Sequence, residues 1–305
     1  MKLSIIIVNW NTGDLLAGCL DSLYNHPPSC PFEVWVVDNA SKDDSFTRLD
    51  GRYDPIHLVQ TNMNAGFARG NNIAARQTEG EYLLLLNPDT VVHPGAIDKM
   101  VAFLDENPRA GAVGPRLLNA DGSTQPSAYP MPTLGRELWR LFHLDRVLPV
   151  ALYPASLYEG PGPRRVDGLT GACMLVRAGV VSRASLFDEA FFIYSEEVDL
   201  CARITQAGYE LYYLPTGTVI HYGGMSTRQT ADAMFLELYK NKVKFFRKHN
   251  GPLQAGMYRR VLELASLARI CSCSRLALAP SPRRQQYQTT TRQYRALLAA
   301  LKQFS

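Results

Sequence analysis

The first half of the chain alternates short apolar runs with amphipathic segments, and this alternation constrains the fold more than any other feature. Leu3–Asn9 is rich in β-branched residues, and residues 12–25 after it place apolar side chains at helical spacing. Residues 33–38 and Tyr82–Leu86 are further apolar runs of strand length. Continuous apolar strands that alternate with helices are typical of a mainly parallel sheet covered on both faces. We therefore predict an α/β fold.

The rest of the chain extends this pattern and then changes character. Residues 120–166 are rich in Pro, Gly and aromatic side chains, which favours an irregular insertion or lid. Residues 258–278 form a basic amphipathic pattern, and residues 280–290 a Pro/Arg/Gln-rich break. Further strands are predicted at 57–60, 82–86, 112–115, 171–177 and 210–214, and further helices at 67–76, 95–106, 195–207 and 231–249.

Composition limits the class of protein. With 46% hydrophobic and 20% charged residues, the chain has the balance of a soluble globular enzyme. Its net charge of +4 is small and no base-reading motif accompanies it, so we expect no nucleic-acid partner. We expect neither a secretory signal nor a spanning helix. The six scattered cysteines favour reduced thiols and a cytoplasmic location.

Polar residues follow three of the predicted strands at their carboxyl ends. Asn9-Trp10-Asn11 follows the first strand, Asp38-Asn39 the second, and Asn87-Pro88-Asp89 the run at 82–86. Open α/β sheets bind ligands at this edge. Asn and Asp also favour turns and helix caps, so turn chemistry explains any single cluster equally well.

Five segments resemble the successive motifs of family 2 glycosyltransferases with the GT-A fold. They are residues 5–11, 36–41, 64–72, 85–90 and 191–203. The Gly-Phe-Ala-Arg-Gly-Asn-Asn run that starts at Gly66 and the Leu-Asn-Pro-Asp-Thr run that starts at Leu86 are similar to the rhamnosyltransferase-like branch. The resemblance covers roughly residues 1–250. It implies a GT-A domain there, a Rossmann-like, mainly parallel sheet flanked by helices, with 120–166 as an acceptor-side insertion or lid and 251–305 as a basic helical extension.

The resemblance also implies a nucleotide-binding set. Asp38 matches the residue that reads the base, and an Asx-turn or helix cap is its alternative. Gly66 and Gly70 allow close approach of a backbone to a ligand at a helix start, and Arg69 adds a charge for phosphate. Trp10 is equally explained by packing. The full set is Asn9, Trp10, Asn11, Asp38, Asn39, Asn64, Gly66, Phe67, Arg69, Asn71 and Asn87.

Asn87-Pro88-Asp89 matches the family's D-x-D metal motif with Asn in place of the first acid. Asp89 and His221 are the metal ligands that the resemblance implies. The cofactor is then a divalent cation, Mg²⁺ or Mn²⁺, which neutralises the departing diphosphate. The missing carboxylate makes metal dependence an open question. A Pro-Asp turn and a packed surface histidine are the simpler explanations of the two ligands.

The segment Ser195-Glu196-Glu197-Val198-Asp199 carries the predicted base. One carboxylate must take the proton of the attacking hydroxyl. The resemblance places this base on Glu197, with Glu196 as its competitor, although acids also favour the first turn of a helix after a Ser cap. Asp199 and Arg203 form an i,i+4 pair or contact the acceptor. Gly171 and Ala172 match the loop that shapes the acceptor side.

We therefore predict an inverting, metal-dependent glycosyltransferase, with L-rhamnose from dTDP-rhamnose as the first choice of donor and a UDP-hexose as the second. The expected acceptor is a glycan or polyprenyl-linked hydroxyl in the synthesis of O-antigen or another surface polysaccharide. The basic C-terminal segment predicts peripheral association with an anionic inner membrane, and a solvated helix face is the alternative. The competing functions are an inactive nucleotide-sugar or glycan-binding protein and a nucleotidyltransferase.

Overall fold

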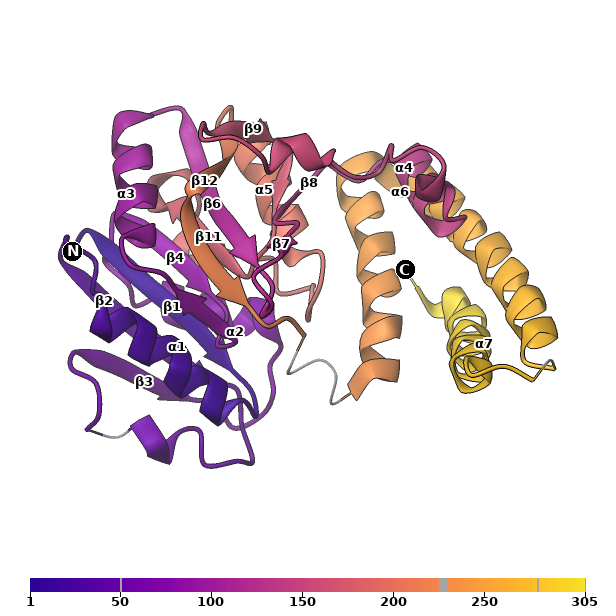
Figure 1. The fold of residues 1–305 in the computed structure, drawn as a ribbon, viewed down its shortest axis with the longest axis horizontal. Helices are drawn as coiled ribbons and strands as arrows, with labels where there is room; N and C mark the ends of the chain where they lie inside the picture. The colour runs from indigo at the N-terminus through magenta and orange to yellow at the C-terminus, as the bar shows by residue number, and fades with distance from the viewer. Residues whose placement is uncertain (50, 225–229, 279, 305) are drawn as a thin grey trace. The chain divides into compact units, whose positions relative to one another are not determined.

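The structure is a computed structural model that describes residues 1–49, 51–224, 230–278 and 280–304. The chain divides into two compact units, each described here by itself (Figure 1). Unit 1 contains the amino-terminal sheet, and unit 2 contains the carboxyl-terminal helices. Unit 1 comprises Met1–Met131, Tyr153–Phe192 and Glu196–Gln229, and unit 2 comprises Pro132–Leu152, Ile193–Ser195 and Thr230–Ser305.

A mixed sheet forms the centre of unit 1. Its main path is β3-β2-β1-β4-β11-β6-β12-β5, with β7 paired to β6 and β9 to β12. β3, β2, β1 and β4 are mutually parallel, as are β6 and β12, and β11 runs antiparallel between β4 and β6. The mainly parallel sheet predicted from the sequence is confirmed. The strands are β1 (Leu3–Asn9), β2 (Phe32–Asp38), β3 (Ile56–Gln60), β4 (Tyr82–Leu86), β5 (Thr90–Val92), β6 (Ala110–Leu118), β7 (Thr124–Gln125), β9 (Arg164–Val166), β11 (Cys173–Arg177) and β12 (Glu210–His221).

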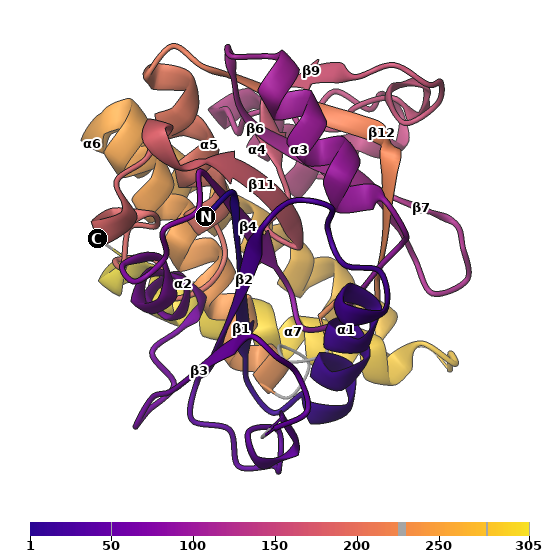
Figure 2. The ribbon, with the colours of Figure 1, turned by 90° about the vertical axis from the view of Figure 1, so that its left-hand side faces the viewer.

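Helices cover both faces of this sheet (Figure 2). α1 (Gly13–Asn25) and α3 (Ala96–Glu106) pack in one hydrophobic core, and α2 (Phe67–Ala75) and α5 (Glu196–Gln206) pack in the other. All seven residues of β1 are buried, and successive side chains enter opposite cores. This two-sided burial is why the strand is a continuous apolar run, and β1 and β4 have the predicted bounds.

Several predicted bounds are wrong. The strand predicted from residue 171 begins at Cys173, the strand predicted at 112–115 spans Ala110–Leu118, and the one predicted at 210–214 continues to His221. The segment 120–166 contains regular structure. Besides β7 and β9 it holds β8 (Ala128–Tyr129), which pairs with β10 (Gly168–Leu169), and the helix α4 (Leu134–Leu141). Strands of two or three residues are too short to show a period in the sequence.

Unit 2 is built on α4, α6 (Ala231–Leu276) and α7 (Arg284–Ala300). Gly251, with φ of 86°, breaks the helical geometry of α6 just before Pro252, so α6 consists of two helices that meet at a kink, as the sequence predicts. The break predicted at 280–290 is wrong beyond Arg284, where α7 begins. Leu297 and Leu301 pack with Tyr239 and Leu262 in the core of this unit, and that burial stabilises a helix of modest propensity.

Candidate functional site

The ends of three parallel strands bring the predicted polar clusters to one edge of the sheet in unit 1. Asn9 is paired with Asp38 in the register of β1 and β2. Ile7 is paired with Leu86 in the register of β1 and β4, so Asn87 leaves the sheet beside the end of β1. The clusters therefore lie at the carboxyl edge, where open α/β sheets bind ligands.

Asp38 is the centre of a hydrogen-bond network at this edge. Its side chain is 1% exposed, and Oδ1 accepts a hydrogen bond from Asn9 Nδ2 at 3.0 Å. Oδ2 accepts from the Ser41 backbone N–H at 3.1 Å and from Gln60 Nε2 at 3.5 Å. Asp38 thus makes a local bond to the backbone three residues on, as the turn or cap alternative expects, and its bonds to Asn9 and Gln60 tie this turn to β1 and β3.

The turns that follow β1 and β2 contain unusual backbone geometry. Asn11 and Ala40 have φ of 52° and 59°, in the left-handed region that non-glycine residues seldom occupy. Asn11 Oδ1 accepts from the Lys42 backbone N–H at 2.7 Å, and its own N–H donates to Ser41 Oγ. Half-buried Trp10 lies between Asn9 and Asn11. Strained backbone of this kind is concentrated at ligand sites.

Asn39 connects these turns to the loop before α2. Its Oδ1 accepts from the Ala65 backbone N–H at 2.8 Å, and its Nδ2 donates to Asn64 Oδ1 at 3.0 Å. Asn64 Oδ1 also accepts from the Gly66 N–H. The structure therefore brings Asn9, Asn11, Asp38, Asn39 and Asn64 into one connected group.

The glycines of the α2 loop have an internal packing role. A Cβ at Gly66, whose φ is 86°, would lie 2.4 Å from the Phe192 carbonyl oxygen, and that oxygen also accepts from the Phe67 N–H. A Cβ at Gly70 would lie 2.7 Å from Val8 Cγ1. At both positions the close approach expected toward a ligand is made by the protein itself.

The polar residues of α2 differ in exposure. Asn71 is 1% exposed and its Nδ2 donates to the Phe67 carbonyl at 2.9 Å, so this side chain stays within the helix. Arg69 is exposed, with its Nε 3.8 Å from Glu189 Oε2. Of the two, Arg69 is the one accessible to a ligand in solution.

A second corner of the site contains Asn87, Asp89 and His221. Antiparallel pairing of β12 with β5 sets His221 opposite Thr90, directly after Asp89. His221 Nε2 lies 3.3 Å from Asp89 Oδ1 and 3.4 Å from Asn87 Nδ2. Among the described residues no group of three His, Cys, Asp or Glu side chains is placed to hold a metal.

The Gln125 side chain in β7 determines which ring nitrogen of His221 carries a hydrogen. Gln125 Nε2 donates to Asn119 Oδ1 at 2.8 Å and to the His221 carbonyl at 3.1 Å, which orients the amide. Gln125 Oε1 then faces His221 Nδ1 at 2.7 Å, and because an amide oxygen only accepts, Nδ1 carries the hydrogen. In the neutral tautomer that this hydrogen bond selects, Nε2 carries the lone pair on the side of Asp89. A second partner that orients a ligating imidazole is typical of metal sites.

These contacts fit a divalent cation. In the neutral tautomer, His221 Nε2 and Asp89 Oδ1 are two acceptors 3.3 Å apart, and a cation bound there would satisfy both. The buried Asn87 Oδ1 has no hydrogen-bond partner. One carboxylate and one imidazole leave most coordination positions to water or substrate phosphate, as is usual for Mg²⁺.

A third corner carries the acidic residues at the start of α5. A Cβ added to Gly171 would lie 3.6 Å from Glu197 Cβ and 3.8 Å from the Phe67 ring. The next residue, Ala172, accepts a hydrogen bond from the Asn87 N–H at 2.9 Å. The turn at Gly171 and Ala172 thus joins the half-buried Glu197 to the Asn87 corner.

Glu196 and Glu197 differ in environment. Glu196 is 4% exposed, and burial, together with the charge of Glu197, raises its pKa well above the usual range. Burial thus favours the protonated form of Glu196, whereas Glu197 is the more exposed of the pair. A base must be ionised, which favours Glu197.

The neighbours of the acidic pair support α5. Asp199 is fully buried, and its Oδ2 accepts from Arg203 Nε at 2.8 Å, so the i,i+4 pair is present. Arg203 also donates to the Leu186 carbonyl. Ser195, directly before α5, has φ of 69°, outside the extended region that is typical of an N-cap residue.

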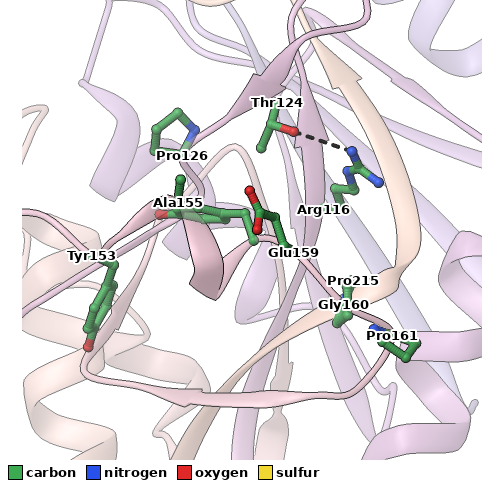
Figure 3. A pocket seen from close by; sticks show the side chains of 10 residues that line it. Arg116, Thr124, Pro126, Tyr153, Ala155, Glu159, Gly160, Pro161 and Pro215 are labelled. Carbon is green, nitrogen blue, oxygen red and sulfur yellow. Dashed lines mark hydrogen bonds between the residues drawn. The ribbon is translucent and has the colours of Figure 1, made fainter.

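One pocket lies apart from these corners. It has a volume of about 740 Å³ and is lined mainly by residues of the 120–166 segment (Figure 3). Thr124 and Pro126 line it, whereas Gln125 between them bonds His221. Arg116 donates to Thr124 Oγ1, and its buried Nε has no hydrogen-bond partner. No residue proposed from the sequence lines this pocket.

Sequence reasoning missed Gln125, Arg116 and Phe192. Gln125 and Arg116 belong to segments without a recognisable motif. Phe192 acts through its backbone carbonyl, which carries no signal in the sequence.

The chain is similar to proteins of known function. Residues 4–157 match the family model described as glycosyl transferase family 2. N-acetylglucosaminyl-diphospho-decaprenol L-rhamnosyltransferase of Mycobacterium tuberculosis is 31% identical over 265 residues, which cover 82% of this chain and 85% of that protein. O-antigen biosynthesis protein RfbC of Myxococcus xanthus is 30% identical, and the match covers 87% of this chain but 20% of that protein.

Solved structures share the fold. A mannosyltransferase from Pyrobaculum calidifontis in complex with GDP-Man and Mn²⁺ superimposes with a TM-score of 0.57 at 18% identity, covering 99% of this chain and 86% of that one. Residues 1–349 of S. aureus TarS in complex with UDP-GlcNAc give a TM-score of 0.55 at 17% identity, covering 99% and 92%. In the part of the chain that the structure describes, no helix combines the length and apolarity needed to cross a bilayer.

Proposed function

The chain belongs to glycosyl transferase family 2, and on that premise we propose that it is an inverting glycosyltransferase, which moves a sugar from a nucleotide-diphosphate donor to an acceptor hydroxyl. The observation that carries this proposal is the turn at Gly171 and Ala172. Gly171 lies against Glu197, and Ala172 accepts a hydrogen bond from Asn87, which is near Asp89 and His221 through the His221 ring. This link within one unit supports a shared site for the proposed base and the proposed phosphate-side ligands.

The proposed reaction is a single displacement. Glu197 takes the proton of the acceptor hydroxyl as its oxygen bonds to the anomeric carbon, and the bond from that carbon to the diphosphate oxygen breaks. One base and no covalent intermediate invert the configuration. Glu196 is the weaker candidate for this step, because burial raises its pKa well above the usual range and favours its protonated form.

Asp89 and His221 are the proposed metal ligands, and Gln125 orients the imidazole. A divalent cation bound there supplies positive charge that stabilises the leaving diphosphate. Half-buried Trp10, Asn11 and Asn64 form the proposed nucleotide face, and exposed Arg69 faces the phosphates. The buried Asn9, Asp38 and Asn39 hold the turns of this face in place.

The proposed donor is dTDP-L-rhamnose, supported by the similarity to the mycobacterial rhamnosyltransferase. The proposed acceptor is a polyprenyl-diphosphate-linked glycan in the synthesis of a surface polysaccharide.

We place its glycan in the pocket at Arg116, because the unpartnered guanidinium nitrogen suits a sugar oxygen. Arg116→Ala should then raise the acceptor KM and leave hydrolysis of the donor unchanged, and an unchanged acceptor KM would remove the pocket from the proposal.

A substrate screen tests the function. The protein is melted with dTDP-, UDP- and GDP-sugars, with and without Mn²⁺, because a ligand raises the melting temperature according to its concentration relative to Kd. The stabilising donor is then incubated with polyprenyl-linked acceptors, and the anomeric configuration of the product is read by NMR. We expect stabilisation that depends on Mn²⁺ and an inverted product. A retained configuration, or donor binding without any transfer, would refute the proposal.

A further inference from the structure

Charge is divided unequally between the two units. Unit 2 contains seventeen Lys and Arg residues against five Asp and Glu, a formal charge of +12, so unit 1 carries −8 within the total of +4. The small overall charge therefore conceals one strongly basic part. A basic surface of this kind attracts polyanions or anionic membranes.

Exposed apolar side chains are concentrated in the same unit. Apart from Met1, Met63 and Tyr222, every large hydrophobic side chain that is exposed among the described residues lies in unit 2. Exposed apolar surface that gathers in one region marks an interaction site, whereas single exposed residues are ordinary.

The second half of α6 orders part of this surface into a stripe. Tyr258, Leu262 and Ala265 face the core of unit 2. The side chains at the opposite helical positions are exposed, with Leu253 at 77% and Leu278, just beyond the helix, at 83%. We call this set the outer stripe, and it consists of Leu253, Met257, Leu264, Leu267, Cys271 and Leu278.

The positive charge of unit 2 favours an anionic membrane over a second copy of the chain as the partner of the outer stripe. Its spacing of three and four residues also suits pairing with a second copy, as in a coiled coil. The seam of such a pair would include Arg260, which is exposed within the stripe. Two copies, each with a unit of +12, would repel one another, whereas an anionic bilayer attracts the same charges.

We propose that the outer stripe and the basic residues around it dock unit 2 on the surface of an anionic lipid bilayer. The helix lies in the interface, with its leucines among the acyl chains and its arginines at the phosphates. The proposal deepens the proposed function, on which it rests for the idea of a lipid-linked acceptor, by naming the surface that meets the membrane.

Vesicle co-sedimentation tests the docking without any sugar donor. The full chain is mixed with vesicles of phosphatidylcholine that contain phosphatidylglycerol, and with vesicles of phosphatidylcholine alone. We expect binding to the anionic vesicles that weakens as salt rises. Leu264→Gln combined with Leu267→Gln should reduce the partition coefficient about tenfold or more. Met63→Gln, which alters an exposed methionine of unit 1, should change nothing.

The results of these experiments distinguish membrane docking from pairing with a second copy of the chain. Equal binding to both kinds of vesicle, no binding to either, or full binding by the double variant would each refute the proposal. Light scattering after size exclusion detects the competing occupant, because a dimer that the double variant converts to a monomer assigns the outer stripe to a second copy. Melting curves confirm that the variants fold. Because no donor is present, a failure of sugar transfer leaves this result intact.

Discussion

Gln125 and His221 show how much one side chain contributes to the proposed metal corner. The Gln125 amide is held by two acceptors, so it assigns the hydrogen of His221 to Nδ1 and leaves Nε2 to bind a cation. Losing a partner of a metal ligand typically weakens metal affinity about 10- to 100-fold.

Gln125→Met should therefore weaken Mn²⁺ binding about tenfold or more while preserving side-chain length. Electron paramagnetic resonance titration of free Mn²⁺ measures the affinity, and ¹⁵N NMR of the histidine rings reports the tautomer directly. Thr124→Ala on the same short strand is the matched control, because that side chain bonds Arg116 and not His221. Equal Mn²⁺ affinity in Gln125→Met and the wild type would show that the amide does not position the ligand.

We expect the buried Glu196 carboxyl to lower the free energy of unfolding at neutral pH. Burial, with the neighbouring charge of Glu197, raises its pKa in the folded state, so the unfolded chain releases the proton at lower pH than the native protein does. Stability from this group is complete below the unfolded pKa and falls as pH rises toward the folded pKa. Glu196→Gln should therefore unfold at higher temperature near pH 7, by about 1 kcal/mol, with the gain vanishing near about pH 4. Melting curves across this range check the trend, and a gain that grew toward acid pH would contradict it.

At the residue scale, the sequence marked glycines that something approaches closely, but it did not show which group approaches them. Gly66 and Gly70 were singled out for approach to a ligand, whereas Phe192 and Val8 are what a Cβ would strike. A glycine shows that something lies close, and only the fold shows what it is.

Among the elements, α4 depends on a buried charge. Glu137 is 5% exposed and accepts hydrogen bonds from Arg140 Nη2 at 2.7 Å and Lys242 Nζ at 2.9 Å. Tyr258 in α6 also donates to it. Burial alone would raise the pKa of Glu137, but the charges of Lys242 and Arg140 outweigh it and hold the pKa at about 2.

Glu137→Gln should destabilise unit 2 by about 2 to 3 kcal/mol, because the buried carboxylate that pairs with Arg140 and Lys242 is lost. The wild type should lose this contribution as pH falls below about 4.5 toward 2, since a lowered pKa stabilises the fold only above the unfolded value. Urea unfolding at neutral and acid pH measures both effects. A variant as stable as the wild type at pH 7 would show that the charge is dispensable.

The sequence predicted elements wherever one long period dominates. β1 and β4 were predicted to the residue because both faces are buried. The short strands in 120–166 and the start of α7 were missed because their stability comes from distant contacts. The helix α4 was missed for the same reason. Its Glu137 pairs with Lys242, which is 105 positions away in the sequence, so no local pattern connects the two.

For the whole molecule, the family and the mainly parallel sheet were predictable from motifs in the sequence. Which residues of the proposed site contact one another is visible only in the structure. Asp89 and His221 are joined only by the pairing of β5 with β12, and Asn87 and Glu197 only through the turn at Gly171 and Ala172. The resemblance to family 2 already placed the base on Glu197, with Glu196 as its competitor. Burial adds a physical reason for this order, because it raises the pKa of Glu196 and favours its protonated form.

The rate of sugar transfer by Glu197→Gln, compared with Glu196→Gln at saturating donor and acceptor, tests the central claim most directly. With Glu197 as the base, Glu197→Gln should bind the nucleotide sugar as the wild type does and lose about 100- to 10,000-fold in kcat. Glu196→Gln should keep most of the activity, because burial favours the protonated form of Glu196, which an amide resembles. Transfer retained in Glu197→Gln and abolished in Glu196→Gln would contradict the account.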